Sequence, residues 1–230
     1  MRYREAWDYQ ERLLQENVRR KSVAFTSADG KGEPTDNYLL FVEHPPVYTL
    51  GKSGNEGNVL LSEENLKARG IDYFRTNRGG DITFHGPQQL VGYPILDLEQ
   101  FYTDIGKYLR NIEEVIILTM AEYGLKGDRS PGETGVWLDP DKKGRERKIC
   151  AIGVRTSRWI TMHGFALNVN TDLDYFNFIV PCGIPDKQVT SLEKELGRRV
   201  DFDEVKEKVK RNFENVFNVT LVNAPDAVLP

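Results

Sequence analysis

The chain has 230 residues, of which 29% are charged and 39% hydrophobic, and its formal net charge is −4. This acidic balance disfavours a dedicated nucleic-acid-binding protein, which usually carries a strongly basic face. No apolar run approaches the ~20 residues that cross a bilayer, and the charged start MRYREAWDYQERL is unlike a signal peptide. Because there are only two cysteines, a disulfide framework is implausible, and we expect a reducing, cytoplasmic setting.

The first half of the chain is predicted to mix helices with short strands. An amphipathic helix is expected at the N-terminus, where apolar residues recur near helical spacing at Trp7, Leu13, Leu14 and Val18. A short apolar run at 38–42 ends at His44-Pro45-Pro46, which breaks regular structure. The pattern then predicts a helix over 62–68, strands over 71–75, 82–85 and 90–96, and a long helix over 103–123. The long helix has one apolar stripe, made of Ile105, Leu109, Ile112, Ile116 and Met120.

The second half of the chain is predicted to contain paired strands and two further helices. Strands over 135–138 and 148–154 flank a hairpin tip at 139–144, another strand covers 160–168, and 172–180 is ambiguous. A short capped helix is expected to end at Gly197, and an amphipathic helix follows over 203–217. Because most strands follow one another without an intervening helix, the order favours an α+β fold with mixed, largely antiparallel sheets and flanking helices. We expect one catalytic domain over 1–230, with 224–230 as a flexible tail.

A glycine-rich stretch, RGGDITFHGPQQ at 78–89, is the densest cluster of unusual residues. Its glycines permit close backbone approach to a ligand. Arg78 and His85 bracket the stretch and are suited to bind an anionic or carbonyl group. The alternative is a turn, a strand and a second turn in which Arg78 makes a structural salt bridge. The spacing alone leaves both interpretations open.

No metal or nucleotide site is predicted. His44, His85 and His163 lack an i,i+4 pair and any accompanying zinc signature, so we expect structural, hydrogen-bonded histidines. Gly51-Lys52-Ser53 imitates the end of a phosphate-binding loop, but Pro46 stands where that loop requires its first glycine. We therefore expect neither a metal nor another cofactor.

The two cysteines have different surroundings. Cys150 lies in an apolar strand, KICAIGV, and is expected to be a small buried hydrophobe. Cys182 lies between proline and glycine in a rigid turn, VPCGIP, where a cation or base would make it a nucleophile. Lys148 opens the strand of Cys150, whose remainder is apolar, and is either a functional residue or an edge lysine with its charged end in solvent.

Several segments together resemble the octanoyltransferases of lipoate biosynthesis, which move an octanoyl group from acyl carrier protein to protein lysines. The matching stretches, in family order, are EHPPVYTLG at 43–51, RGGDITFHGPQQLVGYPILDL at 78–98, RKICAIGVR at 147–155, HGFALNVNTDL at 163–173, PCGI at 181–184 and VTSL at 189–192. One departure is Gln88, where the family usually has glycine, and it puts the turn after His85 in question.

The resemblance implies a fold like the catalytic domain of biotin and lipoate ligases, with Cys182 as the acyl carrier and Lys148 as its partner. It also implies an acyl site lined by Arg78, Gly79, Gly80, Asp81, Ile82, Thr83, Phe84, His85, Ala151, Ile152, Gly153, Gly164, Phe165 and Ala166. Backbone N–H groups near Gly79, Gly80 or Gly153 are the expected oxyanion donors.

The implied partners are octanoyl-acyl carrier protein and, as acceptors, the lipoyl domains of 2-oxoacid dehydrogenases and the glycine cleavage H protein. Because both kinds of partner tend to be acidic, we expect a local basic contact surface at the hairpin tip, made of Lys142, Lys143, Arg145 and Arg147. A solvated tip without a partner is the alternative. Two rival functions stay open: an ATP-dependent lipoate or biotin ligase, and a non-catalytic acyl-binding protein on the same fold.

Overall fold

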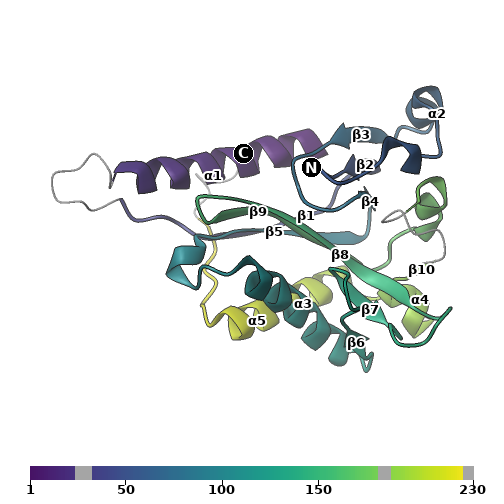
Figure 1. The fold of residues 1–230 in the computed structure, drawn as a ribbon. Helices are drawn as coiled ribbons and strands as arrows, with labels where there is room; N and C mark the ends of the chain where they lie inside the picture. Colours follow the sequence, from purple (N-terminus) through teal and green to yellow (C-terminus); the bar gives the residue numbers. More distant parts are fainter. Residues whose placement is uncertain (24–32, 181–187, 225–230) are drawn as a thin grey trace.

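The computed structural model describes residues 1–23, 33–180 and 188–224. A large sheet lies between one long helix on one face and two helices on the other, and a smaller sheet stands at one end (Figure 1). The elements that the sequence predicts in these segments are all present, which confirms the α+β class. The single-domain organisation stays a prediction, and residues 225–230 of the predicted tail lie outside the described residues.

The large sheet is almost entirely antiparallel, because hairpins connect several of its strands. Its spatial order is β1-β5-β9-β8-β7-β6, and the short strand β10 pairs in parallel with β8. The bounds are β1 Tyr38–Val42, β5 Gln89–Ile95, β6 Gly127–Asp128, β7 Val136–Leu138, β8 Arg147–Ser157, β9 Ile160–Asn168 and β10 Gln188–Val189. The predicted hairpin tip at 139–144 joins β7 to β8, and β8 pairs with β9 from Cys150 to Ser157.

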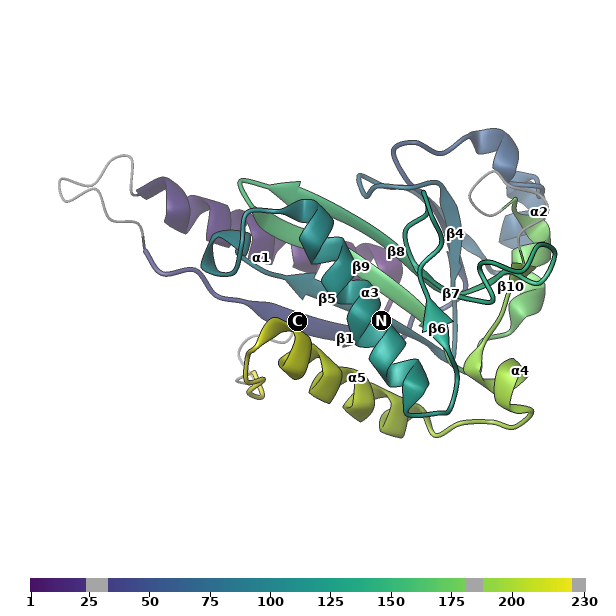
Figure 2. The same ribbon diagram turned by 60° about the horizontal axis from the view of Figure 1, so that its bottom comes forward.

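Helices bury both faces of this sheet. The helix α1, Tyr3–Val23, lies on one face, where Leu13 and Leu14 pack against β5 and β9. The helices α3, Ile105–Ala121, and α5, Phe202–Phe217, lie side by side on the opposite face (Figure 2). The short helix α4, Leu192–Leu196, begins after its N-cap Ser191, as the sequence predicts.

The predicted apolar stripe of α3 divides between two environments. Ile112, Ile116 and Met120 are buried against the sheet. Ile105 is 38% exposed, and Leu109 is only half-buried; both line a cavity described below. Part of an apparently continuous core stripe therefore faces this cavity.

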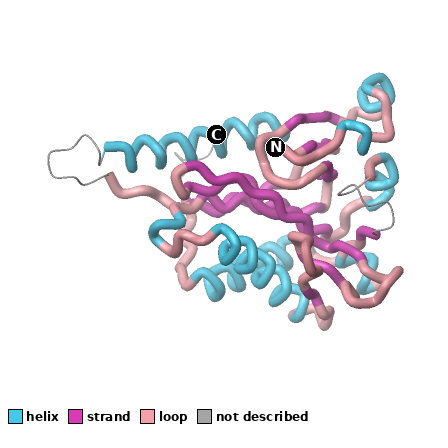
Figure 3. Tube along the Cα trace, in the orientation of Figure 1, coloured by secondary structure: helices cyan, strands magenta, loops and turns pink. Residues whose placement is uncertain are grey.

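The smaller sheet has the order β3-β2-β4, with β2 at its centre. Its strands lie near the N-terminus, apart from the long strands of the large sheet (Figure 3). Its strands are β2 Val47–Leu50, β3 Asp72–Arg75 and β4 Ile82–His85, and the helix α2, Glu63–Ala68, precedes β3. The sequence did not predict β2, because its four residues are too few for periodicity and follow two prolines. All four are buried, and Tyr48 packs with Phe84 and with Phe176 of the 3-10 helix Leu173–Phe178.

None of the helices in the described part of the chain combines the length and the apolar character needed to cross a membrane. This finding agrees with the sequence, which contains no long apolar run.

Candidate active site

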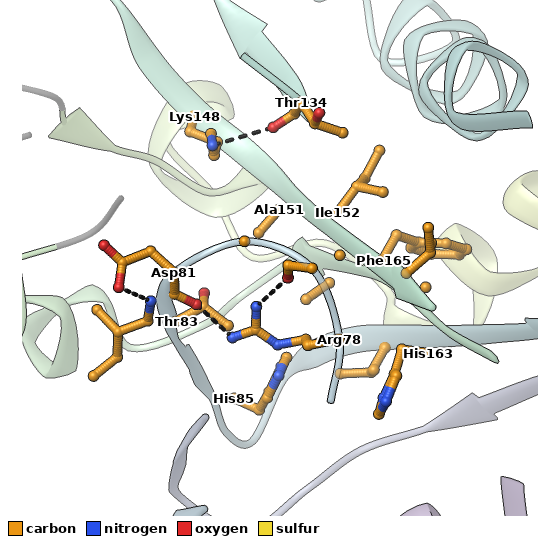
Figure 4. Close-up of a pocket in the computed structure, with 18 of the residues that line it drawn as sticks. Arg78, Asp81, Thr83, His85, Thr134, Lys148, Ala151, Ile152, His163 and Phe165 are labelled. Carbon is orange, nitrogen blue, oxygen red and sulfur yellow. Dashed lines mark hydrogen bonds between the residues drawn. The ribbon is translucent and has the colours of Figure 1, made fainter. Parts of the chain in front are cut away.

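A cavity of about 600 Å³ opens where the large sheet meets the segment before β4 and the loop before β7 (Figure 4). Small-molecule sites commonly enclose ~300–1,000 Å³. The predicted site residues that line it are Arg78, Gly79, Gly80, Asp81, Ile82, Thr83, His85, Lys148, Ala151, Ile152, Gly153, Gly164, Phe165 and Ala166. Phe84 instead lies in the core of the smaller sheet, where its ring stacks on Tyr175. Segments separated by more than 80 residues therefore meet at one site.

Lys148 reaches this cavity from β8 with its side chain only 11% exposed. Its Nζ donates to the backbone oxygen of Thr134 at 3.2 Å, as Figure 4 shows. The same nitrogen lies 3.9 Å from Glu133 Oε2 and 4.6 Å from the centre of the Trp137 ring. Trp137 of β7 is paired with Lys148 in the sheet. A carbonyl, a carboxylate and an aromatic face are all surroundings suited to an ammonium group. Lys148 is thus held in the cavity wall and is no solvated edge lysine.

Cys182 lies outside the described residues, so its distance to Lys148 stays a prediction. Backbone hydrogen bonds hold the described chain on both sides of the undescribed residues. The N–H of Val180 donates to Asn58 O at 2.8 Å, and Val189 pairs with Lys148 in the register of β10 and β8. The N–H of Thr190 donates to Lys148 O at 3.0 Å. After residue 187 the described chain therefore resumes directly beside Lys148.

Arg78 is only 7% exposed, and its guanidinium binds the backbone of the glycine-rich stretch. It donates to the backbone oxygens of Thr49, Gly79 and Asp81 at 2.5–2.9 Å and to the Thr49 hydroxyl at 2.9 Å. Five donors in a fixed fork suit this set of acceptors. These bonds to backbone and hydroxyl oxygens give Arg78 a structural role within the stretch.

The glycine-rich stretch sits directly on β8. The Gly79 N–H donates to Val154 O at 2.9 Å, so this predicted oxyanion donor is already used in binding the strand. A Cβ at Gly153 would lie 2.8 Å from Gly79 O, closer than side-chain carbons approach. A residue without a side chain is therefore required at 153 for the stretch to form this wall of the cavity.

A buried hydrogen-bond chain runs along the cavity wall from His85 toward the end of β10. His85 bonds to Gln89 Oε1 at 2.9 Å, and Gln89 donates to Asn168 Oδ1 at 2.9 Å. Asn168 in turn donates to Thr190 O at 2.9 Å. This chain connects the wall that holds Arg78 to the strand beside Lys148.

The three histidines are neutral, hydrogen-bonded residues. Burial lowers the pKa of His44 to about 4 and that of His163 to about 3, and it lowers the pKa of His85 well below its usual value. His44 bonds to Met1 O and to the Tyr93 hydroxyl. Within the described residues, no group of three or more histidine, cysteine or acidic side chains is arranged to hold a metal ion.

Cys150 is fully buried in the core shared with α3 and α5, as the sequence predicts. Burial raises the pKa of its thiol, which keeps the group protonated. Cys150 therefore has the properties of a packing residue.

Other lining residues were not predicted to belong to the site, because the fold brings them there from distant segments. They include Tyr3, Tyr93, Ile105, Leu109, Glu133, Thr134 and His163. Tyr3 reaches the site from the start of α1, and its ring stacks on His85 at 5.9 Å between centres. Burial raises the pKa of Tyr3 to about 12, so the phenol stays neutral at physiological pH.

Gln88, at the position where glycine was expected, adopts a left-handed conformation with φ of +62°. Its Oε1 accepts from Asn170 at 2.8 Å and from Arg199 at 2.9 Å, and its N–H donates to Glu43. The turn after His85 thus keeps a glycine-like backbone, with the Gln88 side chain hydrogen-bonded to two neighbours.

The predicted basic tip is partly neutralised. Asp139 pairs with Lys142 at 2.5 Å and with Arg147 at 2.7 Å, and Arg147 also pairs with Glu195. Lys143 and Arg145 are exposed. They are the members of the predicted surface that take part in none of these ion pairs.

Comparison with solved structures identifies the fold. A bi-partite lipoate protein ligase from Thermoplasma acidophilum superposes with a TM-score of 0.68 over 89% of this chain and 81% of that one, at 20% identity. A lipoate-protein ligase A bound with ATP gives 0.66 over the same shares, at 17% identity. At these identities the likeness shows the fold alone, and it confirms the lipoate ligase fold implied by the sequence.

Sequence relatives define the family more closely. The model of the lipoyl protein ligase A/B catalytic domain matches residues 2–214. The octanoyltransferase of Christiangramia forsetii is 59% identical over 95% of this chain and 93% of its own length. The octanoyltransferase of Flavobacterium psychrophilum is 58% identical over 96% of this chain and 94% of its own. The chain therefore belongs to the lipoyl protein ligase A/B catalytic domain family, among its octanoyltransferases.

Proposed function

We propose that this protein transfers an octanoyl group from acyl carrier protein to a lysine of lipoyl domains, through a thioester on Cys182 that is assisted by Lys148. The observation that carries the proposal is identity of 58–59% to octanoyltransferases over nearly the whole chain. The cavity supports it, because the predicted acyl-site residues gather there with Lys148 in the wall. The cytoplasmic location stays a prediction.

In the first half-reaction, the Cys182 thiolate attacks the octanoyl carbonyl and expels the thiolate of the carrier, which takes a proton from the Lys148 ammonium and leaves Lys148 neutral. The new C–S bond replaces an equivalent one, so the step is nearly neutral in free energy. A free cysteine is only a few per cent ionised at pH 7, and lowering its pKa by ~2 units requires about 2.7 kcal/mol. An ammonium about 4 Å away supplies about 4 kcal/mol at an effective dielectric constant near 20. Lys148 at that distance is therefore a sufficient activator.

In the second half-reaction, a neutral lysine amine of the acceptor attacks the Cys182 thioester. Its nitrogen forms the amide bond, the C–S bond breaks, and the amine proton leaves to a base, for which Lys148 in its neutral form is the candidate. An amide is more stable than a thioester, so the overall transfer runs downhill without nucleotide hydrolysis.

The octanoyl chain requires an apolar wall beside these groups. Ile105 and Leu109 of α3, with Ile152 and Phe165 of the sheet, supply apolar lining. Burying eight carbons contributes about 6 kcal/mol before losses, at ~0.8 kcal/mol per methylene. This contribution accounts for binding of a medium-length chain.

The test is intact-mass spectrometry after incubation with octanoyl-acyl carrier protein, without ATP. We expect one octanoyl adduct, located on Cys182 by peptide mapping, and its disappearance when an apo lipoyl domain is added. The variant Cys182→Ser should not form the thioester, whereas Cys150→Ser should still form it.

The ligase alternative predicts a different result. A ligase would octanoylate the lipoyl domain from free octanoate and ATP, and would keep this activity in Cys182→Ser. The absence of any adduct together with retained octanoyl binding would favour an acyl-binding protein and overturn the proposal.

A further inference from the structure

Glu113 of α3 is a carboxylate with no exposed side-chain surface. Its Oε2 lies 2.7 Å from Arg110 NH1 and 3.0 Å from Arg129 Nε. Its Oε1 accepts the backbone N–H of Gly135 at 3.0 Å. A buried charge is costly unless it is paired and hydrogen-bonded. Here the carboxylate is fully engaged, and two of its three partners belong to the segment 129–135 that leads into β7.

The hydrogen bond between Glu113 and Gly135 is connected to the Lys148 amine through one peptide unit. The carbonyl of Thr134 and the N–H of Gly135 belong to one planar peptide unit, so they point in opposite directions and rotate together. Lys148 Nζ donates to the oxygen of that unit at 3.2 Å, while Glu113 accepts from its nitrogen. One peptide thus has an ammonium at one end and a carboxylate at the other. Each charge polarises the unit in the sense that strengthens the opposite hydrogen bond.

The peptide lies close against the Lys148 side chain. Gly135 has φ of +123°, and a Cβ there would be 2.5 Å from Cys150 O and 3.5 Å from Lys148 Cε. The lysine stem therefore runs along bare backbone. Rotation of the peptide would move both the oxygen that holds Nζ and the surface against which the stem packs.

We infer that Glu113 is the positioning residue of Lys148, acting through the Thr134–Gly135 peptide. The inference rests on the proposed role of Lys148 in activating Cys182. When an ammonium moves from about 4 to about 6 Å from a thiolate, the attraction between them falls by about 1.4 kcal/mol at a dielectric constant near 20. This loss lowers the ionisation constant of the thiol about tenfold. Loss of the Glu113 contact should therefore raise the apparent pKa of Cys182 by about one unit.

The experiment compares variants that separate reach from charge. Glu113→Asp keeps the charge but is one methylene shorter, and Glu113→Ala removes the acceptor; folding of both is checked by circular dichroism. Glu113→Gln keeps an oxygen within reach of Gly135. Glu114→Gln is the matched control, because Glu114 binds Arg129 at 2.6 Å from the next position of the helix.

The readout is the pH dependence of Cys182 alkylation by iodoacetamide, followed by peptide mass spectrometry, with kcat and KM for octanoyl-acyl carrier protein. We expect Glu113→Asp and Glu113→Ala to raise the apparent pKa by about one unit and to lower kcat about tenfold, with KM unchanged. Glu113→Gln should stay within about threefold of the wild type, and Glu114→Gln should match it.

Lys148→Met distinguishes this inference from the proposed function. If Lys148→Met leaves the alkylation profile unchanged, the proposed pairing of Lys148 with Cys182 fails. If Lys148→Met shifts the profile and the folded Glu113 variants do not, the positioning role of Glu113 is overturned. A shift in Glu114→Gln as large as that in Glu113→Asp overturns it as well, because the effect would then belong to Arg129.

Discussion

Replacement of Arg78 by lysine should destabilise the protein although it conserves the charge. The guanidinium donates to the Thr49, Gly79 and Asp81 carbonyls and to the Thr49 hydroxyl. An ammonium on a straight chain cannot reach acceptors spread around a planar fork, so at least two buried oxygens lose a charged donor. Each such loss costs about 1–3 kcal/mol, and we expect Arg78→Lys to lower the free energy of unfolding by about 2–6 kcal/mol.

Urea unfolding followed by circular dichroism measures this change, and octanoyl loading measured by mass spectrometry reports on the site. Loading should fall with stability, because Gly79 and Asp81 line the cavity. Lys52→Ala is the matched control: Lys52 is exposed beside the same stretch, and its loss should change stability by less than about 0.5 kcal/mol. An Arg78→Lys protein as stable and as active as the wild type would show that charge alone, and not the fork, is what this position supplies.

Three further outcomes are expected. Because burial lowers the folded-state pKa of His44 to about 4 and that of His163 to about 3, the unfolded state binds more protons as the pH falls. Stability is therefore lost from about pH 6.5 down to about pH 4 for His44 and down to about pH 3 for His163. Urea unfolding at pH 7.5 and 5.5 should show a loss of about 1.4 kcal/mol for each of the two, and His85, whose pKa burial also lowers, should add to this loss. Equal stability at both pH values would mean that these histidines are not buried. Gln88→Gly should change the free energy of unfolding by less than about 1 kcal/mol. Relief of the left-handed strain offsets two costs, the lost side-chain hydrogen bonds and the greater flexibility of the unfolded chain. A larger loss in urea unfolding would show that the hydrogen bonds dominate. Reversal of both charges at Lys143 and Arg145 should raise KM for octanoyl-acyl carrier protein several-fold at low salt and less at high salt, whereas a salt-independent KM equal to the wild type would assign the tip to solvent.

Local patterns were sufficient for most of the secondary structure. Helices and strands have different hydrophobic periods, and caps such as Ser191 act within a few residues, so a short window of sequence contains the information. The strand β2 was missed because it is four residues long and is stabilised by the two strands beside it. The family motifs likewise pointed to the glycine-rich stretch and to Lys148, since both are contiguous signals.

The amino-acid sequence by itself determined the α+β class and most of the helices and strands, and its resemblance to a known family indicated part of the cavity lining. Only the tertiary structure decided what those residues do there: that Arg78 binds backbone oxygens, that Ile105 and Leu109 face the cavity, and that Tyr3 reaches it. The same holds for Glu113, which resembles any helical glutamate until the fold brings Gly135 within 3.0 Å of it. The physical reason is that these contacts join segments far apart in the chain, and their geometry is fixed by packing of the two sheets and the helices, which no local pattern contains.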